Sequence, residues 1–307
     1  MTWTARDIPD LHGRTALVTG VTGDLGRETA RGLAGAGARV ILTARNDEKL
    51  RESARRISDE VPRADLDTVV LDLADLSSVR RAAESVLESS AALDILVNNA
   101  GVMATPHRRT VDGFELQLGT NHLGHFALTG LLMPALSEAR VVTVSSLMHR
   151  FALHAPLHDA REERRYHKWL AYSESKLANL LFALELDRRA KAAGLGLTSV
   201  AAHPGYSATQ LQTSGPQLAG KSLWSRVMAA ATPVVGQKPE IGALPSLYAA
   251  TRPDLPGGSY VGPSQLELRG APKLVGMTSA ARNADTAAAL WQRSADATGV
   301  TFLSAVT

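Results

Sequence analysis

The amino-acid sequence predicts an α/β fold in which one doubly wound parallel sheet of about seven strands carries helices on both faces. Two features of the sequence predict it. Short runs rich in Val, Ile and Leu alternate with helical segments through the first two hundred residues. These runs are apolar almost throughout, which is typical of strands that are buried on both sides. Right-handed crossovers through the helices then make neighbouring strands parallel.

The order of the elements follows from the glycines and polar residues that bound each segment. The strand-like runs cover residues 15–20, 38–45, 67–73, 93–101, 139–146, 195–205 and 257–263. The helical segments cover residues 25–36, 47–60, 75–89, 113–136, 172–193, 239–250 and 281–297. We expect a single domain over residues 1–307. Residues 206–237 mix Gly, Pro and Ser with short apolar stretches, and we expect them to form an excursion over the sheet.

The composition argues against several classes of protein. The 33 Lys and Arg against 30 Asp and Glu give a formal charge of +3 without a concentrated basic block, which does not favour nucleic-acid binding. There is no cysteine, and therefore no disulfide framework, thiolate metal site or cysteine nucleophile. The first residues lack the apolar run of a secretory signal, and nowhere do eighteen apolar residues follow one another. We therefore expect a cytoplasmic protein without a membrane span.

The turn after the first strand has the composition of a phosphate-binding loop. It reads Thr19-Gly20-Val21-Thr22-Gly23-Asp24-Leu25-Gly26. Glycines permit a tight bend and a close approach of the backbone to a ligand, and the following helix N-terminus offers N–H groups and partial positive charge. A pyrophosphate is the ligand that such a turn favours. A tight strand-to-helix turn without a ligand is the alternative that this motif alone leaves open.

Several motifs, in their order along the chain, resemble the short-chain dehydrogenase/reductase superfamily. They are the glycine turn, Asn98-Asn99-Ala100-Gly101, Asn121, Ser146, Tyr172-x-x-x-Lys176 and His203-Pro204-Gly205. The combination of TNHLGHF, VVTVSS, YSESKLANLLF and HPG is most similar to the retinol-dehydrogenase-like branch, including its bacterial members. The resemblance spans most of the chain. It implies a Rossmann-type fold and an oxidoreductase that uses a nicotinamide cofactor.

The glycine turn departs from the common family pattern at one position. That pattern is TGxxxGxG, and its middle glycine falls on Asp24, whereas the spacing here is TGxxGxxG with Gly23 one residue earlier. The Asp24 carboxylate either caps the following helix by accepting backbone N–H bonds or weakens cofactor binding by like-charge repulsion of the pyrophosphate. We expect the capping role.

The residues after the second strand predict which of the two nicotinamide cofactors the protein prefers. An acidic residue there would accept hydrogen bonds from a ribose 2′-hydroxyl, and the sequence has Arg45 instead. Arg45 is placed to bind a 2′-phosphate, with Thr43 as a second donor, which favours NADPH and NADP+ over NAD. A solvated arginine at the start of a polar helix is the alternative.

By resemblance, the other cofactor contacts come from the ends of the later strands. Asp72 would face the adenine, and Asn99 with its neighbours would line the adenosine ribose pocket. Pro204, Gly205 and Thr209 would mark where the excursion leaves the nicotinamide. The expected cofactor-binding set is Gly20, Thr22, Gly23, Asp24, Leu25, Gly26, Arg45, Asp72, Leu73, Asn99, Ala100, Gly101, Tyr172, Lys176, Pro204, Gly205 and Thr209.

Tyr172 and Lys176 are the expected carriers of proton transfer. Their spacing of four places them on one face of a helix, about a turn apart. A phenol with an ordinary pKa of ~10 needs a nearby positive charge to exchange protons at neutral pH, and an ammonium supplies it. The resemblance implies that Tyr172 donates a proton to a carbonyl oxygen and that Lys176 holds the nicotinamide ribose. It also implies that Ser146, the second serine of its pair, hydrogen-bonds that oxygen, and that Asn121 anchors a water of a proton relay.

His122, His125, His154 and His158 carry no expected chemistry. His122 and His125 lie beside Asn121, where packing or a supporting hydrogen bond is expected. His154 and His158 have a spacing that can bind metal, but a proline lies between them and no third ligand is evident. We therefore expect no metal site.

The sequence thus predicts an NADP-dependent carbonyl reductase or alcohol dehydrogenase, a ketoreductase in the broad sense, acting on an apolar small molecule. A carbon–carbon double-bond reductase of the protochlorophyllide-reductase type and a catalytically silent NADP(H)-binding sensor are the alternatives. The resemblance also leaves open a homodimer through residues 113–136 and 172–193. A stripe of leucines on the second of these helices fits either that interface or the protein core. Its members are Leu177, Leu180, Leu181 and Leu184.

Overall fold

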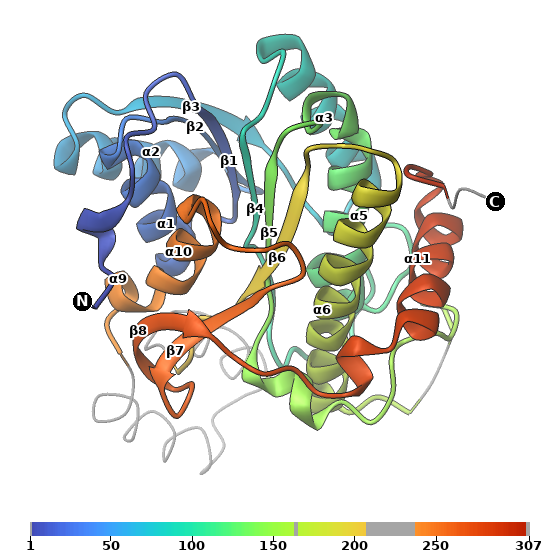
Figure 1. Cartoon of the computed structure of the whole chain (residues 1–307). Helices are drawn as coiled ribbons and strands as arrows, with labels where there is room; N and C mark the ends of the chain where they lie inside the picture. The colour runs from blue at the N-terminus through green and yellow to red at the C-terminus, as the bar shows by residue number, and fades with distance from the viewer. Residues whose placement is uncertain (1, 163–164, 207–236, 305–307) are drawn as a thin grey trace.

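A computed structural model describes residues 2–162, 165–206 and 237–304, which build one eight-stranded sheet with helices on both faces (Figure 1). The strands are β1 (Thr15–Thr19), β2 (Arg39–Ala44), β3 (Asp65–Val70), β4 (Ile95–Asn98), β5 (Arg140–Val144), β6 (Thr198–Ala202), β7 (Tyr260–Gln265) and β8 (Arg269–Leu274). Their order is β3-β2-β1-β4-β5-β6-β7-β8, and every neighbouring pair is parallel except β7 with β8. The doubly wound sheet expected from the sequence is confirmed, and its strand order reverses between β1 and β4.

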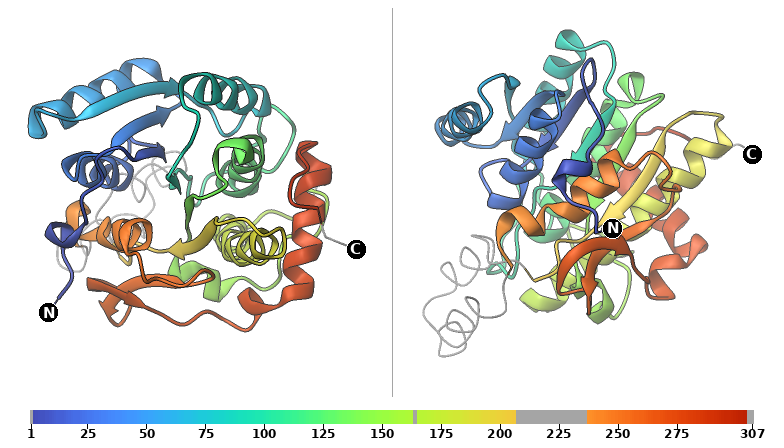
Figure 2. Two further views of the ribbon diagram at one scale, coloured as in Figure 1. Left: turned by 45° about the horizontal axis from the view of Figure 1, so that its top comes forward. Right: turned by 60° about the vertical axis from the view of Figure 1, so that its left-hand side comes forward.

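Two layers of helices cover the sheet (Figure 2). One layer consists of α1 (Asp24–Gly35), α2 (Asp47–Glu60), α9 (Pro239–Gly242) and α10 (Leu244–Thr251), and the other of α3 (Leu76–Ser89), α5 (Gly124–Leu131) and α6 (Lys168–Ala192). Each layer has its own apolar core, because side chains alternate along the strands. In β1, Leu17 points into one core while Ala16 and Val18 point into the other. Burial on both faces is why the strands read as continuous apolar runs.

The sheet has one strand more than the seven expected. β8 runs antiparallel to β7 at the edge of the sheet, and Pro272 of β8 lies opposite Pro263 of β7. Proline cannot donate a ladder hydrogen bond and is tolerated mainly at sheet edges, so the run RGAPKL carries no strand signal. The turn between the two strands uses Leu266 and Glu267, both with positive φ.

The helix expected over residues 113–136 is shorter and interrupted. It consists of one α turn, α4 (Leu116–Leu118), a π-helical stretch, η2 (Gly119–Leu123), and then α5. The N–H of Gly124 donates to the Gly119 carbonyl, five residues back, so the turn that contains Asn121 holds an extra residue. Hydrophobic periodicity does not reveal such a turn. In contrast, α6 is longer than expected and begins at Lys168 instead of Tyr172.

Helix α11 (Ala284–Thr298) forms a third layer outside α5 and α6 (Figure 1). The Trp291 ring of α11 lies 5.1 Å from the Phe126 ring of α5 and 5.8 Å from the Phe182 ring of α6, measured between centroids. In the leucine stripe of α6, the fully buried members are Leu177, Leu180 and Leu181. The leucine stripe therefore belongs to the protein core. Helix α11 also packs on α5 and α6, the two helices that the sequence analysis considers for a homodimer interface. Single 3-10 turns complete the described elements: η1 (Ala5–Asp7), η3 (Met133–Ala135), η4 (Leu147–Phe151) and η5 (Ala280–Arg282).

The expected excursion over residues 206–237 lies outside the described residues except at its two ends. The N–H of Gln237 donates to the Tyr206 carbonyl at 3.0 Å, and the Gln237 side chain donates to the Pro204 carbonyl at 2.6 Å. Tyr206 and Gln237 therefore lie side by side, next to the end of β6. In the described part of the chain, no helix has the length and apolar character needed to cross a membrane.

Candidate active site

The residues singled out from the sequence gather at the carboxyl ends of the parallel strands. In a doubly wound sheet these ends share one edge, and ligands bind in the crevice where the strand order reverses. The glycine turn follows β1 and Asn99 follows β4, the two strands that flank this reversal. Ser146 follows β5, and Pro204 follows β6. The fold thus brings the two halves of the expected site to one edge of the sheet.

Close packing explains two glycines of the turn. Gly20 has a φ of 75°, and a Cβ there would lie 2.8 Å from the Cβ of Ala100. A Cβ on Gly26 would lie 2.5 Å from the Gly20 carbonyl oxygen and 2.7 Å from the side-chain amide of Asn99. Gly23 is different, because the nearest atom to its Cβ would be the Gly20 carbonyl oxygen at 3.5 Å. Gly20 and Gly26 therefore shape the turn, and Gly23 leaves space beside it.

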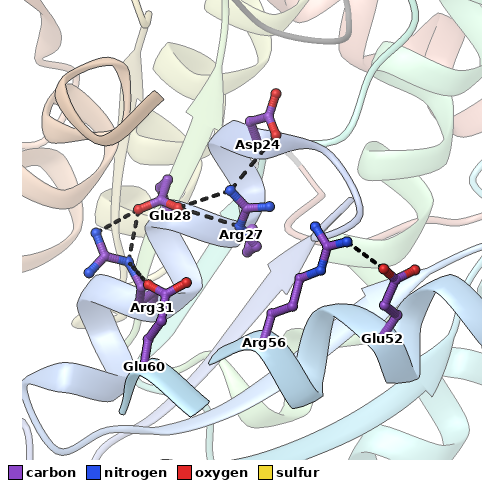
Figure 3. A network of polar contacts seen from close by, with 7 residues as sticks. All are labelled: Asp24, Arg27, Glu28, Arg31, Glu52, Arg56 and Glu60. Carbon is purple, nitrogen blue, oxygen red and sulfur yellow. Dashed lines mark hydrogen bonds and ion pairs between the residues drawn. The ribbon is translucent and has the colours of Figure 1, made fainter. Parts of the chain in front are cut away.

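Asp24 lies inside the helix and is not its N-cap residue. Gly23 is the N-cap of α1, and it has no side chain with which to form a capping bond. The Asp24 carboxylate lies 3.9 Å from the guanidinium of Arg27, which also pairs with the buried Glu28 at 3.2 Å (Figure 3). A negative charge in the first turn stabilises a helix through its dipole. The same charge stands at the end of α1 where a pyrophosphate would bind.

Arg45 directly follows β2 and is exposed. Within the described residues it forms no ion pair, whereas nearby Arg31 and Arg51 are each held by a carboxylate. Arg45 is therefore available to an anion. Thr43 is buried, and its hydroxyl donates to the Val18 carbonyl at 3.3 Å. The expectation that Thr43 is a second donor to a 2′-phosphate is wrong, because its side chain is used inside the sheet.

Asp72 and Leu73 lie in the loop after β3, as expected. The Asp72 carboxylate accepts the backbone N–H of Ala74 at 2.9 Å, which orders the loop. Leu73 is buried, and its carbonyl oxygen would lie 2.4 Å from a Cβ on Gly124. This loop therefore packs directly on the first turn of α5.

Asn99 and Ala100 are tied to the last residue of β1. The Asn99 side chain donates to the Thr19 carbonyl at 2.7 Å, and the backbone N–H groups of Asn99 and Ala100 both donate to the Thr19 hydroxyl at 2.9 Å. Because Thr19 immediately precedes the glycine turn, these bonds fix the turn relative to β4.

Asn121 and Lys176 meet in a buried cluster over Gly101. A Cβ on Gly101 would lie 3.1 Å from the Asn121 side-chain oxygen and 3.5 Å from Lys176 Nζ. Lys176 Nζ donates to the Val144 carbonyl at 3.1 Å, and the Asn121 amide donates to Ser175 Oγ at 3.0 Å. Burial lowers the pKa of Lys176 to about 8. The cluster joins the ends of β4 and β5 to the π turn and to α6.

Tyr172 and Ser146 face each other at the start of α6. Burial raises the pKa of Tyr172 to about 12, and a hydrogen bond with the Ser146 side chain opposes part of that rise. Lys176 Nζ lies 5.8 Å from the centroid of the Tyr172 ring. The Ser145 hydroxyl is buried and donates to the backbone carbonyl of Lys176 at 2.8 Å. This geometry favours Ser146 over Ser145 as the serine that a substrate would meet.

Sequence reasoning missed two partners of these side chains. Ser175 accepts from Asn121 and donates to the Tyr172 carbonyl at 2.7 Å, and its only sequence signal is its place between Tyr172 and Lys176. The Val144 carbonyl, which accepts from Lys176, carries no sequence signal because any residue supplies a carbonyl.

Pro204 and Gly205 lie at the end of β6, and Thr209 lies outside the described residues. Gly205 has a φ of 69°, and a Cβ there would lie 2.4 Å from the Leu268 carbonyl oxygen, so this glycine allows the β7–β8 hairpin to approach. Among the described residues, no group of three or more His, Asp and Glu side chains could hold a metal ion.

Comparisons with known proteins point to one family. The model of the short chain dehydrogenase family matches residues 14–217. "Retinol dehydrogenase 12" of Homo sapiens is 39% identical over 295 residues, which are 94% of this chain and 88% of that protein. The crystal structure of an uncharacterized protein from Mycobacterium Paratuberculosis has a TM-score of 0.81 and 45% identity, covering 98% of this chain and 99% of that one. The RhlG/NADP active-site complex of Pseudomonas aeruginosa has a TM-score of 0.63 and 26% identity, covering 82% and 94%. This chain therefore belongs to the short-chain dehydrogenase family of oxidoreductases, in its retinol-dehydrogenase-like branch.

Proposed function

We propose that this protein is an NADP(H)-dependent enzyme that interconverts a ketone or aldehyde and the corresponding alcohol. The observation that carries the proposal is the meeting of three side chains at the carboxyl ends of the central strands. Tyr172 and Ser146 face each other there, and the buried ammonium of Lys176 lies beside the Tyr172 ring. A phenol, a hydroxyl and a cation in this arrangement can protonate and polarise a carbonyl oxygen.

The described residues suit a phosphorylated dinucleotide. Helix α1 begins at Asp24, and its N-cap residue, Gly23, has no side chain that could compete with a ligand for the backbone N–H groups. Arg45, exposed and without an ion pair among the described residues, supports a 2′-phosphate and hence NADP(H). The structural similarity to the RhlG/NADP complex of Pseudomonas aeruginosa agrees with this choice. When bound, the cofactor would supply the hydride in reduction and accept it in oxidation.

The protein's own residues would handle the proton. In reduction, Tyr172 would donate its O–H proton to the carbonyl oxygen, and Ser146 would donate a hydrogen bond to the same oxygen. The phenol is protonated at neutral pH, which is the state that donates, but burial raises the pKa of Tyr172 and makes the proton harder to give up. The Lys176 ammonium stabilises the phenolate that remains. Asn121, held by Ser175, positions a water that returns a proton to this group.

Exposed apolar side chains in the segments that follow Ser146 and approach Gly205 support an apolar substrate. Phe151 and Leu153 follow Ser146 closely in the chain and are 67% and 70% exposed. Leu268, whose carbonyl oxygen approaches Gly205, is also partly exposed. The names of the relatives, retinol dehydrogenases, agree with an apolar alcohol or aldehyde.

A substrate panel tests the proposal. NADPH and NADH consumption would be followed with apolar aldehydes, ketones and enones, and the products would be identified. We expect NADPH to be consumed with at least one apolar aldehyde or ketone and an alcohol to form. A saturated carbonyl from an enone would indicate a double-bond reductase instead. NADPH binding without turnover of any member would indicate a sensor, and faster turnover with NADH would contradict the cofactor assignment.

A further inference from the structure

We infer that His125 is a positioning residue, which joins the cofactor-binding turn after β1 to the π-helical turn that carries Asn121. His125 lies in the first turn of α5 and is 1% exposed. Its Nε2 lies 2.9 Å from the Thr19 hydroxyl, and its Nδ1 lies 3.1 Å from the backbone carbonyl oxygen of Asn121. The inference rests on the proposed function, because it assigns a role within the same site.

The surrounding donors determine which nitrogen of His125 carries the proton. The Thr19 hydroxyl oxygen already accepts the backbone N–H groups of Asn99 and Ala100, both at 2.9 Å. Its own proton then points to His125 Nε2 at 2.9 Å, which is nearer than a strand carbonyl at 3.3 Å. Nε2 therefore accepts, and Nδ1–H donates to the Asn121 carbonyl. Burial lowers the pKa of His125 to about 4, which keeps the ring neutral as this arrangement requires.

These bonds connect three parts of the site. Thr19 holds the end of β4 and directly precedes the glycine turn, and His125 transmits that position to Asn121. The Asn121 side chain in turn holds Val102, accepting its N–H at 2.7 Å and donating to its carbonyl at 2.9 Å. A π turn contains an extra residue and a looser ladder, so a side chain that holds one of its carbonyls fixes its register. The cofactor-binding turn and the Asn121 turn thereby form one unit.

His122 provides a matched control in the π-helical stretch that precedes α5. It is equally buried, and its Nε2 lies 2.8 Å from the hydroxyl of Ser294 on α11, on the side away from the glycine turn. Burial lowers the pKa of His122 to about 3, so this ring is also neutral. Both histidines are buried and neutral, and they lie in consecutive helical elements. They differ in their hydrogen-bond partners, which are Thr19 and Asn121 for His125 and Ser294 for His122.

Two substitutions of His125 by nearly isosteric residues, asparagine and leucine, separate the effect of the hydrogen bond to Asn121 from the effect of packing. His125→Asn keeps an N–H donor close to the position of Nδ1, whereas His125→Leu fills the same space without a donor. We expect kcat of the Leu variant to be at least about tenfold below that of the Asn variant, with the Kd for NADP+ changed less than about threefold. We expect the Leu variant to be as stable as the Asn variant or more stable, since a buried leucine needs no partner. Activity and stability then follow opposite orders.

A purely structural role predicts that activity follows stability. A Leu variant as active as the Asn variant, or more active, would therefore overturn the inference. The His122→Asn and His122→Leu pair should show no such order in kcat, and an equal loss in His122→Leu would also overturn it.

Hydrogen exchange tests the link without any turnover. On binding NADP+, amide exchange should slow in residues 20–26 and in residues 119–125 of the natural protein. In His125→Asn and His125→Leu, which both lack the bond to the Thr19 hydroxyl, it should slow in residues 20–26 only. Slowing of residues 119–125 in either variant, or its absence in the natural protein, would contradict the link. If the protein binds NADP+ but reduces no carbonyl compound, the proposed function is refuted. The hydrogen-exchange result still tests the role of His125 in that case, because it needs only NADP+ binding.

Discussion

The ammonium of Lys176 donates a hydrogen bond to the carbonyl oxygen of Val144, 3.1 Å away, at a position that is 3% exposed. Among the described residues no carboxylate forms an ion pair with Lys176. Burial without a counter-charge lowers the pKa of this lysine to about 8, from an ordinary value of 10.5. A cation held in this way reduces stability, and it is placed where it can stabilise a phenolate at Tyr172.

The stability of the protein should therefore depend on pH through Lys176. Between about pH 8 and 10.5 the unfolded chain binds more protons at this lysine than the folded chain does, so the free energy of unfolding should rise with pH in that window. We expect a rise of about 1–2 kcal/mol between pH 7.5 and 9.5, measured by urea denaturation. Lys176→Met should be more stable than the natural protein at pH 7.5 and should lose most of that rise.

Lys49 supplies the control, because its side chain is exposed on α2. Lys49→Met should leave the rise with pH intact. If Lys176→Met and Lys49→Met show the same pH profile, Lys176 does not carry a buried charge. Measurements stay below pH 10, because the raised pKa of Tyr172 should lower stability where the unfolded phenol ionises first.

Tyr172→Phe should abolish turnover and preserve cofactor binding. The substitution removes only the hydroxyl, and the ring keeps its buried position beside Lys176. Loss of a general acid lowers kcat by roughly 10²–10⁴-fold, and the Kd for NADPH should change less than about threefold. Tyr166→Phe is the matched control, since the Tyr166 hydroxyl donates to the Thr105 carbonyl outside the catalytic cluster. Activity in Tyr172→Phe close to that of Tyr166→Phe would contradict the acid role.

Much of the fold could be predicted because burial on both faces leaves a clear pattern. Strands β1, β2, β4, β5 and β6 are such runs, and the motif residues follow them at the ends that the topology brings together. β8 could not be predicted, since its pairing depends on β7 and its own sequence disfavours a strand. The π turn and the bonds of His125 depend on tertiary contacts that have no local pattern. The direction of the Thr43 side chain could not be predicted, because the position of a residue at a strand end does not determine whether its side chain points into the sheet or toward a ligand.

Two glycines of helix α1 should respond in opposite ways to alanine. A Cβ on Gly26 would overlap the Gly20 carbonyl and the Asn99 amide, whereas a Cβ on Gly35 meets no atom within 4 Å. Gly26→Ala should therefore lower the free energy of unfolding by about 1–3 kcal/mol and weaken NADPH binding. Gly35→Ala should stabilise the protein by up to about 1 kcal/mol through helix propensity. Urea denaturation and NADPH titration measure both effects, and equal behaviour of the two variants would refute the packing argument.

Arg45→Ala should change the choice of cofactor. A guanidinium that binds a 2′-phosphate contributes only to NADPH, so kcat/KM with NADPH should fall about 10–100-fold while that with NADH changes less than about threefold. Arg51→Ala removes a nearby charge that is already paired with Asp47, and it should leave both values almost unchanged. Equal losses with the two cofactors would show that Arg45 acts on the fold or on the pyrophosphate.

The Asp24 carboxylate should stabilise helix α1 and weaken the binding of NADPH. Its carboxylate lies in the first turn of α1, where a negative charge is stabilising, and Arg27 at 3.9 Å neutralises it only in part. Asp24→Asn should therefore lower the free energy of unfolding by about 0.5 kcal/mol and tighten NADPH binding by several-fold, with a larger gain at low salt. The opposite signs identify electrostatics, because a general loosening of the turn would weaken both. Asp47→Asn, in the first turn of α2, should lower stability without tightening binding. If NADPH affinity is unchanged in Asp24→Asn at low salt, the carboxylate does not repel the pyrophosphate, and the turn tolerates aspartate where the common family pattern has glycine.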